Sequence, residues 1–290
     1  MDNLEHNLKL IKDHRIFCFF HGKKAMIKAI YAKQFGKALD YKHISTFNEI
    51  INVRKLSKNP LYSKCADKKS VQAYVEKKIG KDYLIPQYLY KKNISINDLE
   101  SLPNAFVLKT TSGSGFNIVI KDKSKVDLKN ICEKMNSYVK IKYGYLWGEF
   151  YYNQINNHII AEKLLTENEV YDYKIHCFRD NKNNLRQIIE VLWGPKSNRH
   201  KCMYDTNWQP LKYYFSIPPS KHTFKKPKQL SKLLELSDKL SEDFNYVRVD
   251  FYIINEKIYF GELTFVPAAG FGKFNPPKYD QIWGSWISQD

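Results

Sequence analysis

The sequence has few cysteines and no long apolar run, and these absences exclude several classes of protein. Its 290 residues include five cysteines, an odd number, and no two are spaced as C-x-x-C. We therefore expect reduced thiols in a cytoplasmic protein, without a disulfide framework or a cysteine zinc site. The N-terminus lacks the pattern of a signal peptide. No run approaches the roughly 18 apolar residues of a membrane-spanning helix.

The motifs of several common enzyme classes are also missing. The glycine-rich stretch TTSGSG at 110–115 has no GK[ST] and precedes a predicted strand, so it is not a Walker A loop. His158, His176 and His222 have no acid at a spacing that indicates a catalytic triad, and we interpret them as structural or surface residues. No nucleic-acid motif occurs and the lysines are scattered, so no nucleic-acid partner is expected.

The sequence does have the composition of a folded protein and a large excess of positive charge. Apolar residues make up 43% of the chain, which is typical of a folded protein, and the formal net charge is +17. This charge suits a polyanionic partner such as a nucleotide, an anionic membrane or an acidic polysaccharide, without choosing among them. The length allows one large domain or two to three small ones.

Two β-branched and aromatic runs near the C-terminus predict a hairpin that carries acids. The runs are Val247 to Ile254 and Ile258 to Val266, separated by a polar break at 255–257. A three-residue loop would place Asp250 opposite Glu262 and Arg248 opposite Thr264, all on one face. Two opposed carboxylates repel unless a cation such as Mg²⁺ lies between them. A two-residue turn would instead put the acids on opposite faces, and a solvated hairpin face is the alternative interpretation.

A second pair of predicted strands flanks the glycine-rich loop. Residues 105–110 and 116–121 read as strands, and Lys109 precedes the loop. Small residues let backbone N–H groups turn toward an anion, so the loop is either a phosphate-covering hairpin or a plain glycine turn. Upstream, 67–80 predicts a helix with Lys68 in its first turn, where a cation is disfavoured and an anionic partner would explain it.

The remaining segments predict packing elements. Residues 126–139 and 229–244 have the periodicity of amphipathic helices, and 159–165 begins as a buried strand. Residues 1–60 are harder to interpret: IFCFF at 16–20 fits a buried strand, and 25–35 fits a short helix. The aromatic residues after the hairpin could stack on a substrate or pack a core.

Taken together, these segments resemble the ATP-grasp superfamily and, within it, the TupA-like branch, named for teichuronopeptide synthesis and linked to cell-surface polysaccharides. The resemblance runs from about Leu61 to Trp286. It rests on ADKKSVQAYV, FVLKTTSGSGFNIVI, IIAEKLL followed by DYKIHCF, VRVDFYI and FGELTFVPAAGF in this order. It implies an α+β ATP-grasp fold with two α+β lobes clamping ATP and a short N-terminal region.

The resemblance also implies a role for each matching residue. The nucleotide would be bound by two lysines, the loop tip, the hinge that meets the adenine and an acid near the ribose: Lys68, Lys109, Ser112, Gly113, Ser114, Gly115, Glu162, Lys163, Leu164, Leu165 and Asp172. Arg248 would steady the transferred phosphoryl group, and Lys174 would reach a phosphate. The implied Mg²⁺ ligands are Asp250, Glu262 and Thr264. Thr264 stands where many ATP-grasp enzymes have Asn, and Ser112 where this branch is expected to have His.

The implied domains are an N-terminal region at 1–60 and an ATP-grasp domain at 61–290, with a lid subdomain at about 103–160 and a metal-binding lobe at about 161–290. The implied activity is an ATP- and Mg²⁺-dependent amide ligase joining an amine to a carboxylate in surface-polysaccharide assembly. The expected acceptor is an acidic saccharide or a nucleotide-linked sugar, with possible peripheral association with membrane machinery. The alternatives are a sugar kinase on the same site and a non-catalytic polyanion-binding protein.

Overall fold

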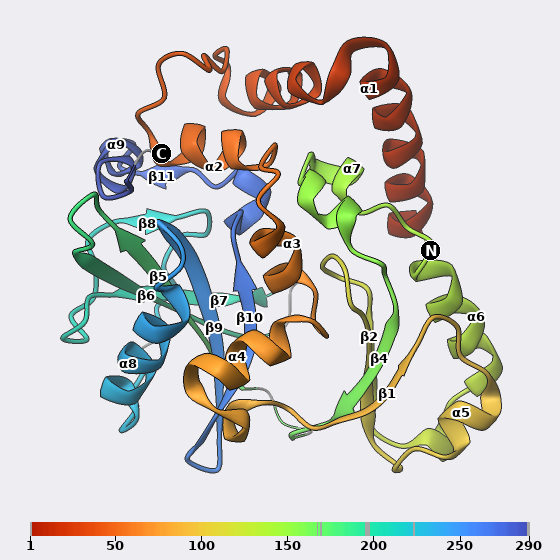
Figure 1. Ribbon diagram of the computed structural model, residues 1–290. Coiled ribbons are helices and arrows are strands. Elements are labelled where there is room, and N and C mark those ends of the chain that lie inside the picture. Colours follow the sequence, from red (N-terminus) through yellow and green to blue (C-terminus); the bar gives the residue numbers. More distant parts are fainter. Residues whose placement is uncertain (1, 167, 169, 195–197, 223, 289–290) are drawn as a thin grey trace. The chain divides into compact units, whose positions relative to one another are not determined.

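The chain forms two compact units, each with its own antiparallel sheet (Figure 1). The computed structural model describes residues 2–166, 168, 170–194, 198–222 and 224–288. Unit 1 comprises Met1–Ile30, Lys55–Tyr74 and Ile85–Glu167, and unit 2 comprises Tyr31–Arg54, Val75–Leu84 and Asn168–Asp290. Helices and antiparallel strands occur in both, which confirms the expected α+β class.

The N-terminal segment is helical, so the strand predicted at 16–20 is wrong. Helix α1 spans Asp2–Phe35 and is broken at Gly22, whose φ of 82° is not helical. Phe19 and Phe20 are 84% and 71% exposed, whereas a buried strand would have to cover them. The helix predicted at 25–35 is confirmed as the second part of α1. The next helices are α2 (Phe47–Arg54), α3 (Pro60–Ala66) and α4 (Val71–Ile79).

The helix predicted from residue 67 begins four residues later, at Val71. The Asp67 carboxylate accepts hydrogen bonds from the backbone N–H groups of Lys69 and Ser70, at 2.8 and 2.7 Å. An aspartate that bonds to nearby backbone in this way favours a turn before a helix. Lys68 therefore lies in this turn and not in the first helical turn.

Unit 1 is built on a four-stranded sheet in the order β1-β4-β2-β3. Phe106 and Leu108 of β2 are fully buried on one face, against Ile131 and Met135 of helix α6. Lys109 alternates with them and lies on the other face. The elements of this unit are β1 (Gln87–Lys91), α5 (Ile96–Glu100), β2 (Phe106–Thr110), β3 (Asn117–Ile120), α6 (Leu128–Tyr138), α7 (Gly144–Trp147) and β4 (Ile159–Lys163).

Unit 2 is built on a five-stranded sheet in the order β10-β9-β5-β6-β7, and helix α8 packs against β5 and β9. Its elements are β5 (Asp172–Arg179), β6 (Leu185–Trp193), β7 (His200–Tyr204), β8 (Tyr214–Phe215), α8 (Leu230–Ser241), β9 (Tyr246–Ile254), β10 (Lys257–Thr264), β11 (Phe274–Asn275) and α9 (Lys278–Gly284). The predicted helices at 126–139 and 229–244 and the predicted strands around the loop and the hairpin are all confirmed, with small differences at their ends.

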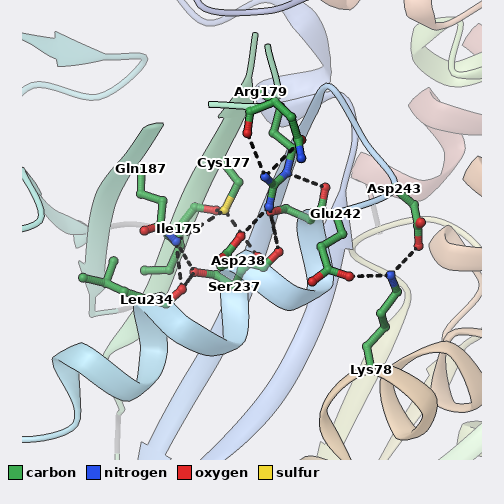
Figure 2. A network of polar contacts seen from close by, with 12 residues as sticks. Lys78, Ile175, Cys177, Arg179, Gln187, Leu234, Ser237, Asp238, Glu242 and Asp243 are labelled. Carbon is green, nitrogen blue, oxygen red and sulfur yellow. Dashed lines mark hydrogen bonds and ion pairs between the residues drawn. The ribbon is translucent and has the colours of Figure 1, made fainter. Parts of the chain in front are cut away.

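Polar contacts fix α8 to the back of this sheet (Figure 2). Figure 2 shows Arg179 of β5 turned toward Asp238 of α8, with which it forms an ion pair. Gln187 of β6 donates to the Ser237 hydroxyl at 2.8 Å and to the Leu234 carbonyl at 2.9 Å. These bonds fix the orientation of α8, whose apolar residues such as Leu233 pack on the same face of the sheet. Because α8 covers this face, most of the charged side chains of the sheet lie on the opposite face.

The aromatic residues after the hairpin are largely core. Trp283 is fully buried and packs edge-on against Phe47, with ring centroids 5.2 Å apart, and its indole N–H donates to the Tyr213 hydroxyl at 3.0 Å. Phe274 packs in the same cluster. Core packing is thus the correct interpretation for these two residues. All five cysteines are free thiols. Among the described helices, none has the length and apolar character needed to cross a bilayer.

Candidate active site

The β9–β10 hairpin places Asp250 directly opposite Glu262 and Arg248 opposite Thr264. The expected pairing is therefore present, but the expected three-residue loop is wrong. The turn consists of two residues, Asn255 and Glu256, both with positive φ, as in the tight hairpin turns that match strand twist. A bulge at Gly261, between Phe260 and Glu262, absorbs one residue and returns Glu262 to the face of Asp250.

Arg248 joins the two carboxylates. Its Nε and Nη2 donate to the two oxygens of Asp250, each at 2.7 Å, in a bidentate pair. The same Nη2 donates to Glu262 Oε1 at 3.1 Å and to the Thr264 hydroxyl at 3.0 Å. The Thr264 hydroxyl in turn donates to Glu262 Oε1 at 2.8 Å. The carboxylates therefore converge on one cationic nitrogen.

Lys174 of β5 adds a second cation to this cluster. Its Nζ lies 2.5 Å from Asp250 Oδ2 and 3.3 Å from Asp172 Oδ2. Burial lowers the pKa of Lys174, but the charges of Asp250 and Asp172 outweigh burial and leave that pKa raised. Burial also opposes the charge of Arg248, and Asp250 again raises its pKa. Both cations are thus held protonated on this face of the sheet.

Burial differs sharply between the two acids. Asp250 is 1% exposed, whereas the side chain of Glu262 is 44% exposed. A hard cation such as Mg²⁺ takes carboxylate oxygens together with phosphate oxygens and water, and it needs only one or two protein carboxylates. Among the described residues no cluster of three or more His, Cys, Asp or Glu could bind a metal alone. A site of two carboxylates fits a Mg²⁺ ion that shares its other ligands with a phosphorylated substrate.

The cluster of charged side chains around Asp250 extends to β6 and β7, which were not predicted to carry site residues. Glu190 of β6 pairs with Lys174 in register, and its carboxylate lies 2.5 Å from Lys201 Nζ of β7 and 3.5 Å from His176 Nε2. Burial lowers the pKa of His176 to about 4. The lone acid in the apolar run IIEVLW at 188–193 was the one signal of this extension in the sequence.

Asp172, expected near the ribose, begins β5 at the edge of the same cluster. One of its oxygens pairs with Lys174, and the other, Oδ1, is buried without a hydrogen-bond partner among the described residues. A buried acceptor of this kind costs free energy until a donor reaches it. Asp172 is therefore able to accept a hydrogen bond from a ligand.

Unit 1 presents a separate group of predicted site residues. Lys109 of β2 and Glu162 of β4 lie on the sheet face opposite the core, and Lys109 Nζ is 2.6 Å from Glu162 Oε2. Lys163 is the last residue of β4, and Leu164 and Leu165 follow it without regular secondary structure. The Lys163 N–H donates to Pro86 O at 2.9 Å. The expected hinge thus lies at the end of β4, immediately before the chain enters unit 2.

The glycine-rich loop joins β2 to β3 and has a fixed base and an exposed tip. Ser112 is buried, and its N–H donates to Asn157 Oδ1 at 2.9 Å, whereas Ser114 and Gly115 are exposed. Gly113 has a φ of 82°, and a Cβ there would approach the Tyr143 ring to 2.7 Å. Only glycine fits this position, for both backbone and packing reasons.

Lys68 contacts this loop. Its backbone N–H donates to Thr111 O at 3.0 Å, and its Nζ donates to Gly113 O at 2.7 Å. Unit 1 therefore brings together two of the expected phosphate-binding elements, Lys68 and the loop tip. Asn157, which fixes the loop base, was not foreseen, because nothing in its local sequence links it to residue 112.

Comparison with known families and structures gives one strong match. The sequence model described as TupA-like ATPgrasp matches residues 48–288. No curated protein sequence matches the chain.

Solved structures align with the chain at low identity. They include D-alanine–D-alanine ligase from Helicobacter pylori (14% identity, TM-score 0.41, 76% of this chain and 60% of that one). The same enzyme from Bacillus anthracis, described as complexed with ATP, aligns at 13% identity and a TM-score of 0.43, over 70% of this chain and 56% of that one. VanG D-Ala:D-Ser ligase from Enterococcus faecalis aligns at 13% identity and a TM-score of 0.43, over 72% and 54%. The chain thus covers less than two thirds of the length of each.

Proposed function

We propose, because the chain belongs to the TupA-like ATP-grasp family, that it is an ATP- and Mg²⁺-dependent ligase that joins an amine to a carboxylate. The observation that carries this proposal is the convergence of Asp250 and Glu262 on one nitrogen of Arg248, beside Lys174. Opposed acids within a group of cations form a site for a metal–phosphate complex, in which positions and charges do most of the catalytic work.

Asp250 and Glu262 would hold Mg²⁺, with Thr264 contributing at most a hydroxyl oxygen. Mg²⁺, when bound, neutralises charge on the phosphate oxygens and withdraws electrons from phosphorus. Arg248 and Lys174 remain protonated beside the acids and supply fixed positive charge to the transferred phosphoryl group. Asp172 offers its unpartnered oxygen as an acceptor, which suits a ribose hydroxyl.

The groups of unit 1 would hold the nucleotide. Lys68 and Lys109 supply charge for its phosphates. Within the loop from Ser112 to Gly115, Ser114 and Gly115 supply backbone N–H groups at the exposed tip. The segment from Glu162 to Leu165 ends a strand and leaves backbone groups beyond Lys163 for the adenine edge.

The proposed reaction has two steps. A carboxylate oxygen of the acceptor attacks the γ-phosphorus of ATP, which forms an acyl phosphate and releases ADP. The amine nitrogen then attacks the acyl carbon, the C–O bond to phosphate breaks, and phosphate and an amide are released with loss of one amine proton. Neither step needs a protein nucleophile, which agrees with the sequence's lack of a catalytic triad.

We take the acceptor to be a uronic acid in a surface or capsular polysaccharide, or its nucleotide-linked precursor. The net charge of +17 supports an acidic acceptor, since positive charge raises the local concentration of polyanions. Because such polymers are assembled at membranes, we also propose a peripheral association of the protein with membrane assembly machinery.

Mass spectrometry of the products tests this function. The protein is incubated with ATP, Mg²⁺ and a panel of uronate glycans and amines, and we expect ADP, phosphate and an amide. A carboxyl-reduced glycan keeps its hydroxyls but offers no carboxylate, so it should not support turnover. Equal turnover with the reduced glycan, giving a stable phosphosugar and no free phosphate, would replace the ligase with a sugar kinase. Salt-sensitive glycan binding without any ATP turnover would leave only a polyanion-binding protein.

Nucleotide binding is tested separately through Lys109. Lys109→Ala removes a phosphate-binding charge and should weaken the affinity for ATP at least tenfold, measured by calorimetry. Lys129→Ala, an exposed lysine on α6 of the same unit, is the control and should leave ATP affinity unchanged. Equal ATP affinity in Lys109→Ala and in the native protein would contradict the phosphate role.

A further inference from the structure

A cavity of about 430 Å³ lies within unit 1, at the end of the sheet that carries the glycine-rich loop. Lys92 follows β1, Ser112 belongs to the loop after β2, and Asn157 precedes β4, and all three line it. Its volume falls within the roughly 300–1,000 Å³ typical of small-molecule sites. The hinge expected to meet the adenine lies at the opposite end of β4. Ser112, at the base of the expected phosphate-binding loop, also lines the cavity, so the cavity adjoins that loop and lies away from the adenine end.

The charge of the cavity is positive. Lys92, Lys140 and Lys142 line it, and no aspartate or glutamate does. All three lysines are exposed, and within the described part of the chain none of them forms an ion pair. Three ammonium groups without acidic partners around one cavity favour an anionic ligand.

The rest of the polar lining consists mainly of amides, which both donate and accept hydrogen bonds. Asn153 Oδ1 accepts from the Gly144 N–H at 3.1 Å, while its Nδ2 is buried with no partner among the described residues. A buried N–H group without an acceptor is unfavourable unless a ligand or solvent supplies one. The other amides are Asn93, Gln154, Asn156 and Asn157.

This chemistry matches one class of ligand. Amide groups pair with vicinal hydroxyls because each offers a donor and an acceptor at fixed geometry. The lysines suit a carboxylate, and the ring of Tyr152 with Ile141 offers apolar surface to the C–H face of a sugar. We infer that this cavity binds an anionic saccharide that carries carboxylates.

The cavity is connected to the loop through Asn157. Its Oδ1 accepts the Ser112 N–H, and its Nδ2 donates to Val139 O at 3.0 Å. A saccharide that contacts Asn157 therefore contacts the residue that holds the base of the glycine-rich loop. Only the identification of this saccharide as the ligase acceptor rests on the proposed function; the binding itself does not.

The experiment measures binding of a galacturonate tetrasaccharide by calorimetry, without ATP or Mg²⁺. Lys140→Gln/Lys142→Gln removes two charges and should raise the Kd at least tenfold. Lys9→Gln/Lys129→Gln changes the net charge equally at exposed positions elsewhere in the unit and should change the Kd less than twofold. Asn153→Asp keeps the acceptor for Gly144 but replaces the buried N–H group with an oxygen, and should also raise the Kd at least tenfold.

Three outcomes would overturn the inference. The first is that the native protein does not bind the tetrasaccharide. The second is that the cavity variant and the control variant raise the Kd equally. The third is that the native protein binds the carboxyl-reduced tetrasaccharide with the same affinity. Competition by inorganic phosphate at the same concentration as the saccharide would assign the cavity to phosphate instead. Backbone amide exchange at 111–115 should slow when the saccharide binds, and unchanged exchange would exclude the connection to the loop.

The inference and the proposed function can fail separately. Glu262→Gln, which lies in unit 2, should still bind the tetrasaccharide with native Kd. If the native protein forms an amide on uronates and the cavity variants bind them normally, the cavity assignment fails alone. If the cavity variants lose binding but no amide forms with any amine, the proposed reaction fails and the saccharide site stands.

Discussion

At the scale of single residues, the charged side chains on the face of the unit 2 sheet opposite α8 differ in how much the fold depends on them. Asp250 is buried and is the shared counterion of Lys174 and Arg248, whereas the side chain of Glu262 is 44% exposed and its Oε1 accepts hydrogen bonds from Arg248 and Thr264. Removing a partner from a buried ion pair leaves an uncompensated charge, which is far more costly than losing a surface pair. The two acids should therefore be separable experimentally.

We predict that Glu262→Gln abolishes Mg²⁺-dependent ATP turnover with little change in stability, while Asp250→Asn abolishes turnover and also destabilises the protein. The expected loss in unfolding free energy is roughly 3–5 kcal/mol for Asp250→Asn and about 1 kcal/mol or less for Glu262→Gln. Chemical denaturation gives the stabilities and coupled ADP detection gives the rates. Near-native turnover in Glu262→Gln would contradict its role as a metal ligand.

His176 predicts a pH dependence of stability. Burial lowers its pKa to about 4 from an ordinary 6.5, so the folded protein keeps it neutral. A lowered folded-state pKa contributes stability above pH 6.5, and that stability is lost as the pH falls toward 4. Between pH 7 and pH 5 the native protein should lose on the order of 2 kcal/mol more than His176→Gln, as measured by urea denaturation. If the unfolding free energies of the two proteins change equally with pH, His176 does not contribute this pH dependence.

At the scale of elements, the pairing of Asp250 with Glu262 in the β9–β10 hairpin depends on both the turn and the bulge, because each shifts the register by one residue. A two-residue turn at Asn255–Glu256 would by itself place Glu262 on the wrong face, and the extra residue Gly261 corrects it. A Cβ on Gly261 would lie 3.0 Å from the Asp250 carbonyl oxygen and 3.2 Å from the ring of Tyr252. Glycine at this position lets the bulged strand come close to its partner.

This geometry predicts that a substitution at position 261 is worse than a deletion. Gly261→Val introduces a β-branched side chain that favours regular pairing, which would place the new valine opposite Asp250 and turn Glu262 away. Deleting Gly261 leaves Phe260 opposite Phe251 and Glu262 opposite Asp250 without a bulge. We expect at least a tenfold loss of ATP turnover for Gly261→Val and a smaller loss for the deletion. The reverse order would mean that the bulge serves another purpose.

At the scale of the whole molecule, the first sixty residues are not an appendage. Phe47 of α2 is fully buried in unit 2 and packs against Trp283 and Tyr246, and the Asn48 N–H donates to Asp280 Oδ1 at 2.8 Å. The stretch before it contributes Met26 and Ile27 to the buried residues of unit 1. Both units therefore draw core residues from the region that the sequence analysis set apart as 1–60.

A fragment of residues 61–290 should consequently fail to fold cooperatively. Loss of Phe47 alone leaves a large hole in an aromatic core, and such deletions typically cost about 3–5 kcal/mol. Circular dichroism melting of the fragment beside the full chain tests this. A cooperative transition near that of the full chain would show that 61–290 is an independent domain.

Net charge also acts at the scale of the molecule. With a charge of +17, capture of a uronate polymer should be accelerated by long-range attraction and weakened by salt. We expect kcat/KM for the polymer to fall several-fold between about 50 and about 200 mM salt, while that for a uronate monosaccharide changes less than about twofold. If kcat/KM for the polymer and kcat/KM for the monosaccharide depend equally on salt, the salt effect arises from ATP, which both reactions share, and not from capture of the polymer.

The sequence by itself determined the local elements and the list of chemically competent residues. Alternating β-branched residues predicted the strands of the hairpin and of the loop, helical periodicity predicted α6 and α8, and the motifs placed Asp250, Glu262, Lys68 and Lys109 in one family pattern. These signals are local, because strand alternation, helical spacing and turn chemistry depend on neighbours along the chain.

Only the tertiary structure decided how those residues meet. The opposed acids depend on a bulge at Gly261, whose position follows from how β10 packs beside β9 and not from the loop composition. The Glu190–Lys201–His176 contacts join three strands, and Asn157 fixes a loop 45 residues away. The segment IFCFF has strand-like composition but is helical and carries two exposed phenylalanines. Contacts between distant residues and register shifts of one residue depend on free energies of packing that no local window of sequence contains.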